Sequence, residues 1–85
     1  MVKLKLVRGD DWEGLYIGDN LYEEDHVLGG EVYLNLINNY KINIDLNGQY
    51  EVYYIDQEWL ELAGSLPNKF SNIDDSLLEL QYKSK

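Results

Sequence analysis

The chain has no cysteine, and only one histidine and one proline among its 85 residues. Without cysteine there is no disulfide to staple the fold and no thiolate to act as a nucleophile or a metal ligand. A single histidine without cysteine supplies too few ligands for a structural zinc site. The chain therefore has to fold without a disulfide or a zinc centre.

Long apolar runs are also missing. No window approaches the ~20 consecutive apolar residues that a transmembrane helix requires. The first five residues alternate apolar and basic side chains, which differs from the apolar run of a signal peptide. We expect a cytoplasmic protein with no membrane contact.

Basic residues are scarce. Seven Lys and Arg face sixteen Asp and Glu, and the net charge is −9. Such a field repels nucleic acid and anionic membranes and favours basic surfaces on partner proteins. The acidic excess is spread along the chain rather than confined to one block. Because net charge also keeps a small protein soluble, the sequence leaves open whether the charge is functional or only solubilising.

The remaining composition is that of a globular protein, with 45% hydrophobic residues and eight tyrosines. A chain of this length buries only about 60–65% of the surface that its unfolded form exposes, so its stability margin is thin. We predict that residues 1–85 form a single compact domain.

The first part of the chain predicts three strands. Apolar residues alternate over residues 2–7, which is the period of a half-buried strand. A turn follows at residues 9–11, and a second strand is predicted over residues 13–17. Residues 18–20 can supply the positive φ values of a tight hairpin, which leads into a third strand over residues 21–24.

The middle of the chain predicts a short helix over residues 31–38 and then a β-hairpin. The hairpin pairs residues 42–46 with residues 50–54. A two-residue Asn-Gly turn would place the apolar sets of the two strands on opposite faces. A three-residue loop over residues 46–48 restores the match, because a slip of one residue reverses every side chain.

The last part predicts a second short helix and a final strand. Asp56 is a suitable N-cap, and Gly64 is a suitable C-terminal stop. The residues expected on the buried side of this helix are Trp59, Leu62 and Ala63. Alternation over residues 78–82 predicts a strand, and a helix over residues 74–80 is the alternative. Together these elements predict an α+β fold with a mainly antiparallel sheet of five or six strands and two short helices on one face.

Two sequence blocks carry a resemblance to a known group of proteins. Residues 11–16 read Asp-Trp-Glu-Gly-Leu-Tyr and are followed, after a short turn, by an acidic run that ends in His26. The second block is Glu-Trp-Leu-Glu at residues 58–61, followed by Ala-Gly-Ser-Leu-Pro at residues 63–67. The chain resembles small proteins of phages and bacterial mobile elements. The resemblance implies a phage-like origin and no particular activity.

No catalytic constellation is recognisable. The sequence shows no Ser-His-Asp arrangement and no dinucleotide motif, and Gly9, Gly14 and Gly18 are spaced too widely to cradle a pyrophosphate. Asp10 and Asp11 are explained by turn formation. We expect a protein that is not an enzyme and needs no cofactor.

The aromatic residues and one acidic run are the candidate binding features. Tyrosine and tryptophan anchor interfaces because they bury a large rigid area and keep one polar atom. A patch of Trp12, Tyr16, Tyr22 and Tyr53 is predicted, rimmed by Glu13 and Glu23, with Tyr53 pointing outward. The densest charge belongs to Glu23, Glu24 and Asp25, which also fit an edge strand protected by charge.

These features favour a small acidic protein-interaction module that inhibits or modulates a host nucleic-acid-binding protein. Its partner would be a protein with a basic surface, and we expect no direct binding to nucleic acid. The residues predicted to contact the partner are Trp12, Glu13, Tyr16, Tyr22, Glu23, Glu24, Asp25 and Tyr53. Two alternatives stay open: a small-ligand or metal-dependent binding module centred on His26, and a structural subunit of a larger assembly.

Overall fold

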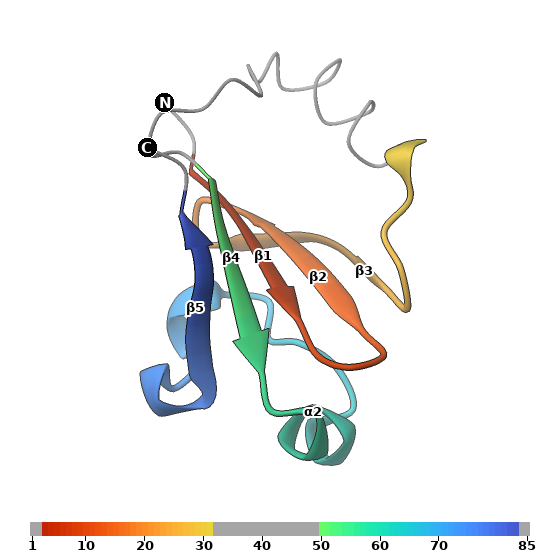
Figure 1. The fold of residues 1–85 in the computed structure, drawn as a ribbon, viewed down its shortest axis with the longest axis vertical. Coiled ribbons are helices and arrows are strands. Elements are labelled where there is room, and N and C mark those ends of the chain that lie inside the picture. Colours follow the sequence, from red (N-terminus) through yellow and green to blue (C-terminus); the bar gives the residue numbers. More distant parts are fainter. Residues whose placement is uncertain (1–2, 32–49, 84–85) are drawn as a thin grey trace.

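A computed structural model describes residues 3–31 and 50–83 as an α+β fold (Figure 1). Within these residues five strands form one sheet in the order β3-β2-β1-β4-β5. The strands are β1 (Leu4–Arg8), β2 (Glu13–Ile17), β3 (Asn20–Asp25), β4 (Tyr50–Ile55) and β5 (Leu78–Lys83). Helix α2 (Gln57–Ala63) and two 3-10 turns, Phe70–Asn72 and Asp75–Leu77, follow β4. None of the helices in this described part has the length and apolar character of a membrane span.

The sheet is mixed rather than antiparallel throughout. Strands β1–β2, β2–β3 and β4–β5 pair antiparallel, whereas β1 and β4 run parallel at the centre, with Leu4 beside Tyr50. Parallel neighbours require a long connection, and the chain between β1 and β4 is long enough to supply it. Three of the four described pairings are antiparallel, as expected for a mainly antiparallel sheet, and the parallel pairing at the centre was not predicted.

The local signals of the first hairpin are confirmed. Strand β2 has the predicted bounds, Glu13 and Ile17, and β1 covers most of the predicted first strand. Gly18 has a φ of 60° in the turn before β3, a left-handed conformation that glycine adopts without steric cost. The turn therefore has the glycine that its backbone requires.

Both predicted caps of α2 are confirmed, but its predicted buried face is right only for Trp59, which packs against the core, and is wrong for Leu62 and Ala63. The Asp56 carboxylate accepts a hydrogen bond from the Glu58 N–H at 3.4 Å, and Gly64 ends the helix with a φ of 83°. Leu60 is only 3% exposed, whereas Leu62 is 89% exposed. Of the other two residues expected in the stripe, Trp59 is half-buried and Ala63 is exposed. A helix of seven residues makes fewer than two turns, so its apolar spacing alone does not define the buried side.

The remaining predicted elements have different outcomes. The final strand is confirmed as β5, and the alternative helix over residues 74–80 is reduced to the 3-10 turn Asp75–Leu77. Of the two predicted helices, the described part contains α2 and only the first residue of the other, Glu31, which is helical. Residues 32–38 of the other predicted helix, and the strand and loop predicted over residues 42–48, lie outside the described residues. The hairpin pairing predicted for residues 50–54 is wrong, because β1 and β5 occupy both edges of β4.

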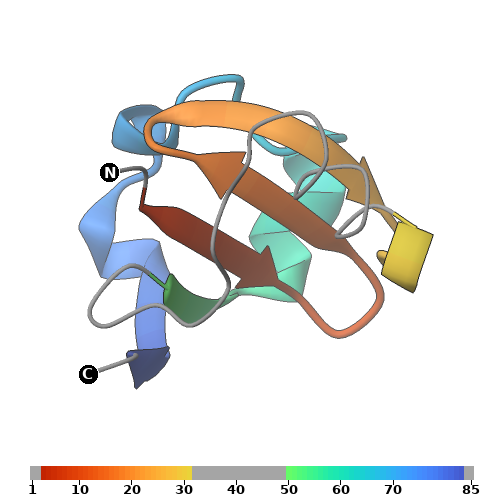
Figure 2. The same ribbon diagram turned by 90° about the horizontal axis from the view of Figure 1, so that it is seen from above.

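Apolar side chains pack on both faces of the sheet. Buried residues on one face are Leu4, Leu6, Leu15 and Leu28; on the other they are Val7, Tyr16, Ile55, Leu60, Leu66 and Ile73. The second face is covered by α2 and by the segment after α2, which contributes Leu66, Phe70 and Ile73. Figure 2 shows α2 behind the strands. A side chain at Gly14 would overlap Leu66, so glycine lets that segment pack directly on β2.

Glu51 on β4 is a buried charged residue, 5% exposed, and is held by three partners. The Tyr53 hydroxyl donates to its Oε1 at 2.8 Å, and the Nζ atoms of Lys3 and Lys83 lie 3.4 and 3.8 Å from its Oε2. Burial alone would raise the pKa of Glu51. The Tyr53 hydrogen bond and the two lysines outweigh burial and bring the pKa below the ordinary value of 4.5.

We expect Glu51→Gln to lower the free energy of unfolding by about 2 kcal/mol near neutral pH, because it removes the charge from a hydrogen-bonded buried site. A carboxyl group whose folded-state pKa is lowered stabilises the fold above its unfolded pKa and loses that contribution as the pH falls. The difference between the two proteins should therefore shrink below pH 4.5. Urea unfolding at several pH values measures it; a difference that is constant with pH would contradict the ionised state of Glu51.

Candidate functional site

The acidic run of β3 is divided between the interior and the surface. Glu24 is half-buried, and its Oε1 accepts hydrogen bonds from the Trp12 Nε1 at 2.9 Å and from the Leu66 N–H at 3.1 Å. Its neighbours Glu23 and Asp25 are exposed. Among the described strands β3 lies at an edge of the sheet. Glu24 therefore stabilises the fold, whereas Glu23 and Asp25 are accessible to a partner.

Glu13 is also occupied within the fold. Its Oε1 accepts a hydrogen bond from the Leu28 N–H at 3.0 Å, and its Oε2 lies 3.6 Å from the Nε of Arg8. The side chain is half-buried rather than free at the surface. The predicted role of Glu13 as the rim of an aromatic patch therefore has no support in its geometry.

Tyr16, predicted as a surface anchor, lies in the interior with 0% exposure. Its hydroxyl donates to the Pro67 carbonyl at 2.6 Å, and its ring meets Phe70 edge-on at 5.5 Å. Burial, together with the negative charges of Glu24 and Asp19, raises the pKa of Tyr16 well above its ordinary value of 10. A partner cannot reach this side chain, so the prediction is wrong.

The other predicted aromatic residues do not form one surface. Tyr53 packs 5.3 Å from Phe70, and burial and its hydrogen bond to Glu51 raise its pKa to about 12, so the predicted outward orientation is wrong. Trp12 packs against the same apolar cluster as Tyr53, while Tyr22 packs against the cluster on the opposite face. The predicted patch fails because the segment after α2 covers the side of the sheet on which Tyr16 and Tyr53 lie.

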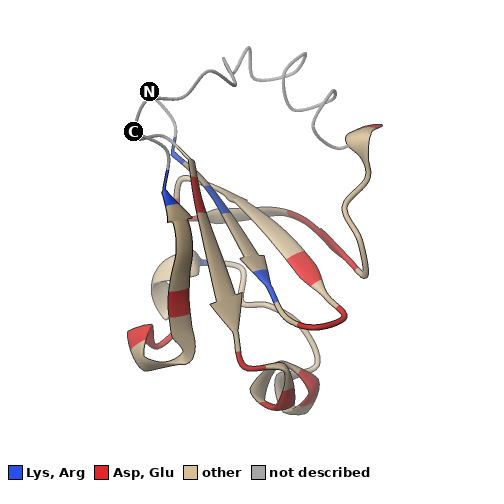
Figure 3. Cartoon of the chain, viewed as in Figure 1, with Lys and Arg blue, Asp and Glu red and all other residues tan. Residues whose placement is uncertain are grey.

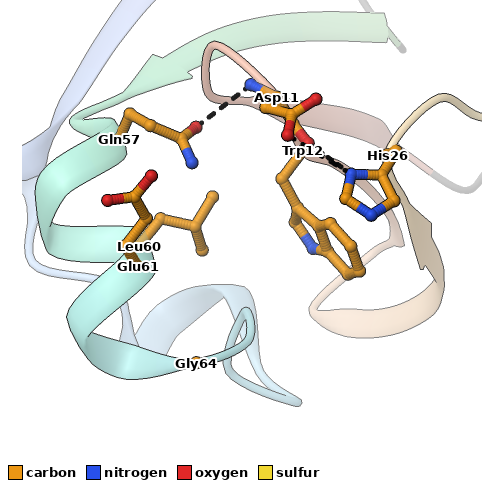
Figure 4. A pocket seen from close by; sticks show the side chains of 7 residues that line it. All are labelled: Asp11, Trp12, His26, Gln57, Leu60, Glu61 and Gly64. Carbon is orange, nitrogen blue, oxygen red and sulfur yellow. Dashed lines mark hydrogen bonds and ion pairs between the residues drawn. The ribbon is translucent and has the colours of Figure 1, made fainter.

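A cavity of about 210 Å³ opens between α2 and the β1–β2 turn (Figure 4). Its lining residues are Asp11, Trp12, His26, Gln57, Leu60, Glu61 and Gly64. Gln57, Leu60 and Glu61 share one helix face, since they are three and four residues apart. Of the lining residues, the sequence prediction had named only Trp12 and His26 as candidates; the Gln57–Glu61 spacing was the available signal for the helix wall.

The turn side of the cavity is held in place by contacts to α2 and to His26. The Asp11 N–H donates to the Gln57 Oε1 at 3.2 Å, and the Asp11 Oδ2 lies 3.5 Å from the His26 Nδ1. The Trp12 and His26 rings meet edge-on at 5.0 Å. A side chain at Gly9 would overlap the Gln57 amide, so glycine lets the turn approach α2. The cavity thus combines an apolar wall with two exposed carboxylates, those of Asp11 and Glu61.

A metal centre at His26 gains no support from its surroundings. Over residues 3–31 and 50–83, no three His, Cys, Asp or Glu side chains are grouped so that they could hold a metal ion. The carboxylate paired with the His26 ring is that of Asp11. These two side chains alone are too few to form a ligand set.

Figure 3 shows Asp and Glu on the turns and on α2 at one end of the described chain, whereas Lys and Arg lie mostly on the strands. Its five lysine and arginine residues already have contacts within the fold. These contacts are Lys3 and Lys83 to Glu51, Arg8 to Glu13, Lys69 to Asn20, and Lys5 above the ring of Phe70. None of these five forms an ion pair with the exposed carboxylates of the β1–β2 turn, the α2 cap and α2. We call that set the acidic end: Asp10, Asp11, Asp56, Glu58 and Glu61.

Comparison of the chain with protein-family models, with curated proteins and with solved structures finds no match to any of them.

Proposed function

We propose that the protein is an acidic protein-interaction module that binds a basic surface on another protein. The acidic end carries the proposal, because its carboxylates lack ion pairs with the described lysines and arginine while those cations are engaged elsewhere. Glu23 and Asp25 on β3 extend the accessible negative charge. A partner whose basic surface normally contacts nucleic acid fits this charge, and occupation of that surface would inhibit it.

The physical basis of the interaction is long-range electrostatics. Exposed carboxylates of one sign repel one another in the free protein and attract a basic surface before contact. Complementary charge of this kind raises the association rate, and salt screens it within about 10 Å at 0.1 M ionic strength. The resemblance to phage and mobile-element proteins stays a prediction, and it suggests a bacterial host protein as the target.

The test is a pull-down from a bacterial lysate with the immobilised protein, washed at low and then at high salt. We expect a stoichiometric nucleic-acid-binding protein that elutes as the salt concentration rises. For the purified partner, Glu58→Lys with Glu61→Lys should slow association about tenfold, because it reverses charge at the acidic end. The matched control, Asp75→Lys with Glu79→Lys, changes the net charge equally on exposed residues of the second 3-10 turn and β5, which are not members of the acidic end.

Two results would contradict the proposal. Equal association rates for the two double variants would remove the acidic end from the interface. Binding that persists at high salt would show that charge does not drive it. A divalent cation or metabolite that raises the melting temperature, with the shift lost in His26→Ala, would instead favour the ligand-binding alternative. Self-association of the purified protein would favour the assembly subunit.

A further inference from the structure

The geometry points to an arginine side chain of the partner as the occupant of the cavity between α2 and the β1–β2 turn. We propose that this arginine enters beside Trp12 and places its guanidinium group between Asp11 and Glu61. The inference rests on the proposed function and adds to it one anchoring residue of the partner. Interfaces commonly concentrate their binding energy in a few such buried anchors, with arginine among the most frequent.

The apolar lining suits the stem of a long cationic side chain. Leu60 from α2 and the indole of Trp12 from the turn lie on opposite sides of the cavity (Figure 4). The methylene groups of arginine bury well against apolar surface while the charged end stays near polar groups. A carboxylate or phosphate ligand would instead meet the carboxylates of Asp11 and Glu61, neither of which pairs with a described lysine or arginine.

The polar lining favours arginine over lysine. Asp11 and Glu61 belong to the two walls, and a planar guanidinium carries five N–H donors, enough to serve both carboxylates. The Gln57 Oε1 already accepts a hydrogen bond from the Asp11 N–H, so the two carboxylates are the acceptors left for the guanidinium group. An ammonium group has fewer donors and no planar fork, so it can satisfy the two walls less well.

The cavity is also held open before a partner arrives. Glu24 fixes the Trp12 indole through its Nε1, and the contact between Asp11 and Gln57 fixes the distance from the turn to the helix. Binding therefore does not have to order these groups. Preorganisation of this kind preserves affinity because less conformational entropy is lost.

The test is an NMR titration with the capped peptide Gly-Arg-Gly and its citrulline and lysine counterparts. We expect the Trp12 indole N–H and the Gln57 and Gly64 amides to shift with the arginine peptide. Citrulline, which keeps the shape and lacks the charge, should leave them unchanged, and lysine should bind several-fold more weakly. Glu61→Gln should weaken binding of the arginine peptide about fivefold, the effect of an ion pair worth about 1 kcal/mol.

Glu58→Gln is the matched control, because it removes the same charge from an exposed position of α2 that does not line the cavity. Equal weakening by the two variants, or equal shifts with arginine and citrulline, would overturn the assignment of the cavity. That failure is separable from failure of the proposed function. Suppose that a basic partner binds in a salt-dependent manner and that Glu61→Gln and Glu58→Gln weaken its binding equally. That result would overturn the cavity assignment and leave the proposed acidic module intact. Both substituted residues are exposed, so unchanged NMR spectra outside the cavity would verify that the two variants keep the fold.

Discussion

Tyr16→Ala is expected to lower the free energy of unfolding by about 3–5 kcal/mol, which is the usual cost of removing a buried aromatic side chain. Tyr16 is fully buried and joins β2 to the segment after α2 through Pro67 and Phe70. A domain of this size has only about 5–15 kcal/mol in total. The variant should therefore lose a large part of its stability, which urea unfolding followed by circular dichroism measures.

Two further variants separate the parts of that effect. Tyr16→Phe removes only the hydroxyl that donates to Pro67 and should cost about 1–2 kcal/mol. Tyr82→Ala is the control, because Tyr82 is 56% exposed on β5. Its effect should stay below about 1 kcal/mol. If Tyr16→Ala cost no more than Tyr82→Ala, the interior position of Tyr16 would be refuted.

Glu24→Ala should lower the free energy of unfolding by about 3 kcal/mol. Its carboxylate accepts two hydrogen bonds, from the Trp12 indole and the Leu66 N–H, and each bond to a charged acceptor is worth about 1.5–3 kcal/mol. The substitution leaves both donors without their partner in a half-buried site. Urea unfolding measures the loss, and the Trp12 indole N–H resonance should move at the same time.

Glu23 provides the matched comparison on the same strand. Glu23→Ala removes the same charge from an exposed neighbour and should change stability by less than about 0.5 kcal/mol. Equal destabilisation by the two variants would argue against the contacts of Glu24. The pair also separates stability from partner binding, because only Glu23 has its carboxylate accessible in the free protein.

Elements that depend on neighbouring residues could be predicted from the sequence. The turn at Gly18, the N-cap at Asp56 and the left-handed stop at Gly64 each follow from the backbone requirements of one residue. The alternation of apolar and polar residues also predicted β5, although a helix over residues 74–80 was the alternative. These signals act over a few residues, so tertiary packing has little opportunity to reverse them.

Contacts between distant segments could not be predicted. The parallel pairing of β1 with β4 joins strands separated by much of the chain. Gly14, Leu15 and Tyr16 are buried in succession because packing covers both faces of β2, which removes the alternation that would have shown Tyr16 to be internal. Likewise, the choice between Leu60 and Leu62 depends on where α2 meets the sheet.

The candidate site was predicted only in part for the same reason. Trp12 and His26 were named as candidates, but for separate roles, and the structure brings them together at one cavity. The helix wall of that cavity comes from residues far along the chain, which reach the β1–β2 turn only through the fold. Conversely, Glu24 was assigned to a partner because its run of charge resembles a surface, although its carboxylate points to Trp12 and Leu66.

The bond between Tyr16 and Pro67 spans 51 residues, and this separation constrains how the molecule is made. A ribosome releases the first hairpin well before the residues that cover Tyr16 exist. Until then the nascent hairpin has to keep that ring in water or in non-native contacts. Because such distant contacts slow folding, closure over β2 can follow only after Pro67 and Phe70 have been made, and chaperones have their opportunity to bind before it.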